Sequence, residues 1–150
     1  MILFAGVLFT IIYVAFVAVI GGELAWYVDA ASFVFVLAPL VYFFLITKSG
    51  KSICSYVKSG FTKNYAYARG ELDSIAGAAK NAMKVTLAAG GISFLIGLMI
   101  VLRRFDDPQM LGPYLSVMLV SLLYSLVISF FVFFPLQAWA ENKIKASEKD

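Results

Sequence analysis

Between Leu87 and Leu136 the chain has the sequence LAAGGISFLIGLMIVLRRFDDPQMLGPYLSVMLVSLLYSLVISFFVFFPL. Two long apolar runs flank a short polar turn, RRFDDP, and neither run contains a charged residue. An apolar run of about 20 residues is long enough to cross the roughly 30 Å hydrocarbon core of a bilayer as a helix. The stretch therefore predicts two membrane-spanning helices joined by a hairpin turn outside the hydrocarbon.

The composition extends this prediction to the whole chain, which is 62% hydrophobic with a mean hydropathy of +0.91. A soluble domain of this size could not bury so much apolar surface. Backbone groups in lipid need internal partners, and the alternation typical of a barrel strand is absent, so helices remain. We expect one all-α integral membrane domain over residues 1–150 with four transmembrane helices. These spans are expected at residues 2–20, 24–46, 83–102 and 113–138, with a cytoplasmic segment at 47–82.

The positive charges predict the orientation of these spans. Ten of the 12 Lys and Arg residues fall between residues 48 and 84 or after residue 140. The other two, Arg103 and Arg104, lie in the hairpin turn. Because cytoplasmic loops carry the excess of Lys and Arg, we expect both termini in the cytoplasm, in a multi-pass protein of a bacterial inner membrane. The net charge of +3 then reflects topology and attraction to the lipid bilayer, and no nucleic-acid partner is expected.

The cytoplasmic segment is expected to contain two helices. Ile53, Tyr56, Val57 and Phe61 recur at helical spacing, which predicts a helix lying near the membrane surface. Gly70 is expected to interrupt the chain. A stripe of apolar residues that follows it predicts a helix leading directly into the third span, so the spans extend into the cytoplasm.

The third span has small residues at intervals of four, Ala89, Ser93 and Gly97, widened by Gly90 and Gly91. Small residues let helix backbones approach closely in lipid. Two interpretations stay open for this stripe. It either packs helices within one subunit, or it faces an oligomer axis where a partner helix sits.

The fourth span has Ser121, Ser125 and Ser129, again four residues apart. Serine hydroxyls in a helix often bond back to a carbonyl of the preceding turn. Three hydroxyls on one face also form a polar track that water or an ion could follow. Both interpretations stay open from the sequence.

Nothing in the sequence predicts an enzyme, a metal site or a bound cofactor. The chain has no histidine, and its single cysteine, Cys54, lies in the expected cytoplasmic segment. No catalytic dyad, phosphate-binding loop or metal-ligand cluster is present in the sequence. We expect the acidic pair Asp106 and Asp107 to be solvated in the turn beside the two arginines.

Two blocks of residues resemble the MotA/TolQ/ExbB family of ion-driven motor subunits, and within it the MotA proteins. The first block contains Gly21-Gly22, Leu24, Asp29 and Ser32. The second block contains Gly90, Ile96-Gly97, Asp106-Asp107-Pro108, Leu111-Gly112-Pro113, Leu123-Tyr124 and Pro135-Leu136. The two blocks extend over residues 21–32 and 90–136.

The resemblance implies five such subunits around a dimer of a single-span partner of the MotB/TolR/ExbD kind. The partner's helix would carry the Asp that binds the transported ion, here expected to be a proton. Ion flow would then rotate the pentamer around the dimer and perform mechanical work. The candidate ion-path or partner-facing residues are Ser93, Phe94, Gly97, Ser121, Leu122 and Ser125.

The chain also departs from the family pattern. Phe94 and Leu122 stand where family helices three and four commonly have threonine, which argues against a sodium pathway. The large cytoplasmic domain of the MotA proteins is reduced to a short segment. These departures keep open an alternative function, a non-conducting membrane scaffold of the same architecture. A self-contained solute transporter is less consistent with spans that contain no ionisable residue.

Overall fold

The computed structural model describes residues 8–13, 15–16, 19, 29–59, 67–103 and 108–147, and every regular element in these ranges is a helix. The prediction of an all-α protein is therefore confirmed for this part of the chain. The described residues of the first expected span are helical. Most of that span, the outer turn at residues 21–28 and the centre of the hairpin turn lie outside the described residues.

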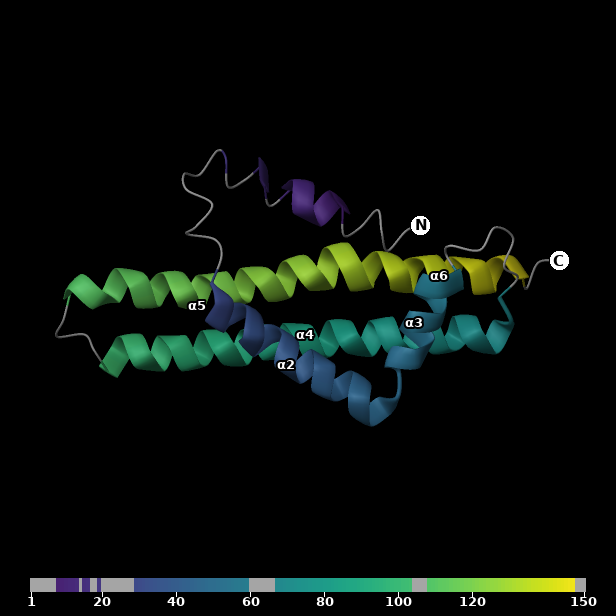
Figure 1. Ribbon diagram of the computed structural model, residues 1–150, viewed down its shortest axis with the longest axis horizontal. Coiled ribbons are helices and arrows are strands. Elements are labelled where there is room, and N and C mark those ends of the chain that lie inside the picture. Colours follow the sequence, from purple (N-terminus) through teal and green to yellow (C-terminus); the bar gives the residue numbers. More distant parts are fainter. Residues whose placement is uncertain are drawn as a thin grey trace.

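A long antiparallel hairpin forms the body of the molecule (Figure 1). Its first arm is α4 (Arg69–Arg103), and its second arm consists of α5 (Pro108–Ile128), η2 (Ser129–Phe133) and α6 (Phe134–Ser147). Both arms are longer than the predicted spans, as the expected cytoplasmic extension requires. Three described helical stretches are long and apolar enough to cross a membrane: Ala30–Thr47, Arg69–Arg103 and Leu111–Ser147.

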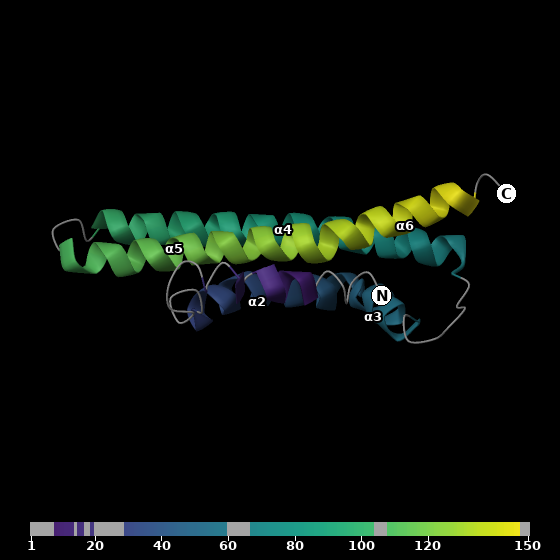
Figure 2. The ribbon, with the colours of Figure 1, turned by 90° about the horizontal axis from the view of Figure 1, so that it is seen from above.

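The helix α2 (Ala30–Thr47) corresponds to the second expected span and lies on one side of the hairpin with α3 (Gly50–Ser59), as Figure 2 shows. Pro39 lies inside α2 without ending it. Lys48 follows in the left-handed conformation, with φ of 53°, and so terminates the helix. The chain then turns into α3 within two residues.

The second arm contains one π-helical turn that the sequence did not predict. The backbone N–H of Phe134 donates to the carbonyl of Ser129, five residues earlier. Pro135 comes next and has no N–H, so the ordinary α-helical bond is missing at this position in any case. The π turn inserts an extra residue just before this proline, where α5 passes into α6.

The open end of the hairpin, where α4 begins and α6 ends, has its own hydrophobic core. It consists of buried residues from α3, α4 and α6: Tyr56, Ile75, Ala79, Leu136 and Ala140. The Trp139 ring lies 4.7 Å from the Tyr56 ring and 5.3 Å from the Tyr67 ring, measured between centroids.

Two expectations about residues 47–82 can be compared with the structure. Tyr56 is buried and Ile53 packs against the same cluster, so these two residues of α3 contact protein, whereas Phe61 lies outside the described residues. Gly70 does not interrupt the chain, because α4 already begins at Arg69. The backbone N–H of Ala68 donates to the Glu71 carboxylate at 3.1 Å, which stabilises this earlier helix start.

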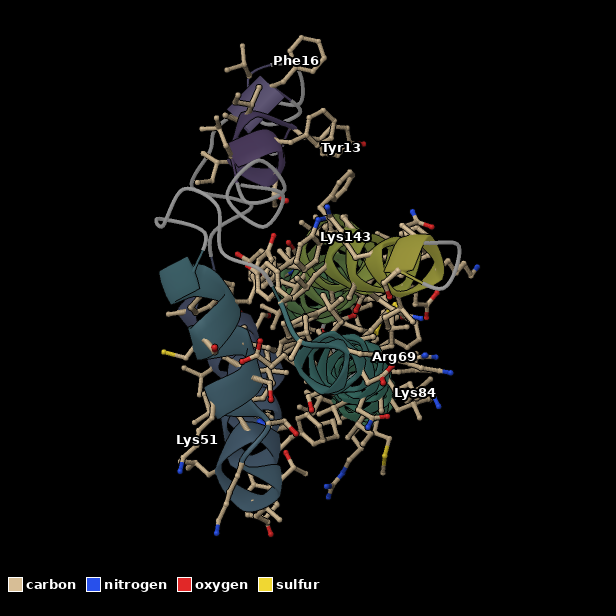
Figure 3. All side chains as sticks on the ribbon, turned by 90° about the vertical axis from the view of Figure 1, so that its right-hand side faces the viewer. Tyr13, Phe16, Lys51, Arg69, Lys84 and Lys143 are labelled. Carbon is tan, nitrogen blue, oxygen red and sulfur yellow. The ribbon has the colours of Figure 1, made fainter. Side chains whose placement is uncertain are left out.

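Large apolar side chains remain exposed along the hairpin. On α4 these include Leu95, Met99 and Leu102, and on α5 they include Leu119 and Leu123. Basic side chains project outward from the helices, and Lys51 and Lys84 lie on opposite sides of the molecule when it is viewed from the end (Figure 3). The apolar surface requires lipid or another protein to cover it.

Candidate functional site

The two arms of the hairpin approach most closely at glycines of α4. A Cβ atom built on Gly90 would overlap the side chain of Ser125 on α5. A Cβ atom on Gly97 would lie 2.8 Å from the Cβ of Met118. Both glycines, together with buried Ala89, thus lie at helix contacts within the chain. Gly91 differs, because a Cβ there would have no neighbouring atom within 4 Å among those described.

The three serines of the fourth span lie in the interior of the helical unit. Ser121 donates to the Met118 carbonyl and Ser125 to the Leu122 carbonyl, each at 2.8 Å. Ser129 instead reaches across to the Met83 carbonyl of α4 at 3.4 Å. All three side chains are buried, so their hydroxyls do not form an exposed track on this chain.

A pocket of about 100 Å³ lies between α2, α4 and α5. It brings together Ser93, Gly97 and Ser121 from the residues that the sequence predicted for the ion path. It also contains Ser32 of α2, whose hydroxyl donates to the Val117 carbonyl at 3.1 Å. Its apolar wall is formed by Phe35, Ile96, Ile100 and Val117.

The other predicted residues do not line this pocket. Phe94 and Leu122 each follow a pocket serine in the sequence, and successive helical residues are turned by about 100°. Both side chains are half-buried. Ser125 lies deeper, closed off against Gly90. Three of the six predicted residues, Ser93, Gly97 and Ser121, therefore line the pocket beside α2. Ser125 lies in the helix contact with Gly90, and Phe94 and Leu122 do not line the pocket.

The start of α2 adds residues that the sequence analysis assigned no structural role. The Asp29 carboxylate accepts a hydrogen bond from the backbone N–H of Ser32 at 2.7 Å and so caps the helix. The backbone N–H of Asp29 donates to the Tyr124 hydroxyl of α5 at 3.1 Å. The pKa of the Asp29 carboxyl is lowered, chiefly by the hydrogen bond to the Ser32 side chain and further by backbone amides. Desolvation acts in the opposite direction but is weaker. The spacing Asp-x-x-Ser before an apolar run was the available signal for this cap.

The membrane portion of the hairpin contains hydroxyls but no charge. The sequence has no ionisable acid or base between Lys84 and Arg103, or from Pro108 to Ala140, other than tyrosines. Among the described residues, no group of His, Cys, Asp and Glu side chains could hold a metal ion. The serine hydroxyls of these spans can form hydrogen bonds with water, but the spans provide no carboxylate that could carry a proton.

The described fold and site define a multi-pass helical membrane protein. No protein-family model matches the chain. A stretch of 52 residues is 42% identical to chemotaxis protein PomA of Vibrio alginolyticus, and it covers 35% of this chain and 21% of PomA. A stretch of 59 residues is 37% identical to the uncharacterized protein YtxD of Bacillus subtilis strain 168, over 39% of this chain and 22% of YtxD.

The matched part thus spans about a fifth of the length of each relative. The similarity indicates at most a relation to MotA-like proteins.

Proposed function

We propose that this chain is the pentamer-forming subunit of a proton-driven, stator-like motor in a bacterial inner membrane. Its partner is a single-span protein of the MotB/TolR/ExbD kind, whose helix supplies the proton-binding Asp. The observation that carries the proposal is a long, closely packed hairpin with internal hydroxyls and no acid in its membrane portion. The partial similarity to a chemotaxis protein supports it.

The need for a partner follows from the cost of charge in hydrocarbon. An isolated charge in the hydrocarbon costs several kcal/mol or more, so a proton pathway needs an ionisable side chain or water within the membrane. These spans contain no carboxylate to accept the proton. The exposed apolar side chains of α4 and α5, such as Leu95 and Leu119, leave a surface on which a partner helix or another copy can pack.

The hairpin also offers a route for mechanical output. From Lys84 to Arg69, α4 continues without interruption for about 22 Å, at 1.5 Å per residue. The aromatic cluster around Trp139 ties this extension to α3 and α6. Rotation of the membrane portion would therefore turn the cytoplasmic end as one body.

A specific observation favours a second candidate, a non-conducting scaffold of the same architecture. Ser121 and Ser125 donate to carbonyls of their own helix and are buried. Phe94 and Leu122 are apolar and lie outside the pocket lining. A partner's Asp that faced these two residues would meet no hydroxyl from this chain.

Co-expression with a single-span protein encoded beside this chain tests both candidates. Native mass spectrometry in detergent gives the number of copies, and a pH-sensitive dye in liposomes gives the proton flux. Five copies with a flux that disappears when the partner's Asp is changed to Asn would support the motor. The same assembly without flux would support the scaffold. A chain that stays monomeric with and without the partner would contradict both.

A further inference from the structure

The pocket between α2, α4 and α5 contains unused hydrogen-bonding capacity. The Ser32 hydroxyl already donates to the Val117 carbonyl, and the Ser121 hydroxyl donates to the Met118 carbonyl. Each of these oxygens keeps lone pairs that can accept a hydrogen bond. The Ser93 hydroxyl lines the same pocket and makes no hydrogen bond to another described residue. One donor and two acceptors therefore meet in a space of about 100 Å³.

Water matches this arrangement in both size and chemistry. A space of about 100 Å³ is large enough to hold at least one water molecule, which needs two to four polar partners to be held in a protein interior. Hydroxyl groups donate and accept, as water does. A cation fits poorly, because none of the lining residues carries a charge.

We propose that this pocket is an internal water site, in which water accepts a hydrogen bond from Ser93 and donates to Ser32 and Ser121. The site is built from residues of one subunit, and its apolar wall is partly exposed at Phe35, Ile96 and Ile100. Unpaired hydroxyls in hydrocarbon are costly, so the water satisfies Ser93 and links α2 to both arms of the hairpin.

The position of the pocket sets the side from which water enters. Gly97 and Ile100 lie nearer to the hairpin turn at Arg103 than to Lys84. Phe35, Ile96 and Ile100, which line the pocket, are exposed, so the pocket opens to the surface of the helices. Water therefore enters from the side of the membrane on which the hairpin turn lies.

Cysteine labelling of the full-length protein in its membrane tests this site. The single native thiol is first removed by Cys54→Ser, and Ser93→Cys then places a similar-sized thiol in the pocket. Thr86→Cys is the control for a sealed interior position, because Thr86 is fully buried on the same helix. Leu95→Cys is the control for an exposed apolar position on that helix. A small, permanently charged methanethiosulfonate reagent is added from one side of the membrane at a time, and the remaining thiols are counted by a gel shift after denaturation.

Only a hydrated thiolate reacts readily, so we expect the cysteine at position 93 to react at least about tenfold faster than either control, and from the turn side. Equal rates at positions 93 and 95, or at 93 and 86, would overturn the proposal. Labelling of position 93 only from the side opposite the turn would overturn the entry route. If the Ser93→Cys protein fails to insert, Ser121→Cys reports on the same pocket against the same controls, with the same two outcomes.

The water site does not depend on the proposed motor function. Labelling needs neither the partner nor proton flux. A dry pocket in a conducting complex would refute the water site alone, whereas a wet pocket in a chain that never assembles would refute only the motor.

Discussion

Replacement of Gly90 by alanine is the sharpest test of how the hairpin packs. The added Cβ would overlap both the Oγ and the Cβ of Ser125. A rotamer change moves the Oγ, but the Cβ is fixed to the α5 backbone, so the two helices must separate. Forcing extra atoms into a packed interface costs about 1–3 kcal/mol. We expect Gly90→Ala to lower the free energy of unfolding by that amount. The net loss is smaller because alanine stabilises a helix more than glycine does.

Gly91→Ala is the matched control for this experiment. It lies one residue further along the same helix, and its new Cβ would meet no described atom within 4 Å. In both variants the helix preference of alanine over glycine raises the free energy of unfolding by about 0.5–1 kcal/mol. The difference between them therefore isolates the contact with Ser125. Thermal unfolding in detergent, followed by size-exclusion fluorescence, measures both variants against the unchanged protein.

A second substitution locates the contact. Ser125→Gly removes the Cβ and the hydroxyl that the new alanine would meet, so it should recover most of the loss in the Gly90→Ala protein. Residues in direct contact show interaction energies of about 0.5–3 kcal/mol in such a double-mutant cycle. Equal stability of the Gly90→Ala and Gly91→Ala proteins, or additivity of the two changes, would refute the packing described here.

Three further changes test other parts of the structure by the same unfolding assay. Ser129→Ala removes the hydrogen bond to the Met83 carbonyl and should cost about 0.5–1.5 kcal/mol, whereas no loss would mean that this contact is not formed. Trp139→Ala empties the aromatic core at the open end of the hairpin and should cost about 3 kcal/mol while leaving the detergent-embedded helices intact by circular dichroism. Asp29→Ala removes the cap of α2 and should cost about 1 kcal/mol. Because the folded-state pKa of Asp29 is lowered, this last contribution is complete above its unfolded-state pKa and disappears as the pH falls through the folded-state pKa, so a cost that stays constant with pH would contradict it.

The hairpin could be predicted from sequence because its signals are local. Two charge-free apolar runs separated by RRFDDP require two helices in lipid, whatever else the chain does. The continuation of α4 from its expected span back to Arg69 was also predictable in part from its apolar stripe. The precise start at Arg69 was not, because it depends on the Glu71 carboxylate accepting a hydrogen bond from Ala68.

The roles of the small residues could not be predicted, because helical spacing does not say which neighbour each face meets. Gly90 and Gly91 are adjacent and chemically identical, yet one lies against Ser125 and the other has open space around it. The same limit applies to Ser93 and Ser121, whose convergence with Ser32 depends on where α2 crosses the hairpin. The π turn before Pro135 also depends on the contacts of Ser129 with α4.

The two faces of the hairpin place a specific demand on any proton path. Hydroxyls converge at Ser93 and Ser121 beside α2, whereas Phe94 and Leu122 are turned away from them and are apolar. A partner helix that packs against Phe94 and Leu122 would bring its Asp to two residues without hydroxyls. A proton would then have to reach it through water. Proton flux through a complex with a dry pocket would therefore place the path entirely between subunits.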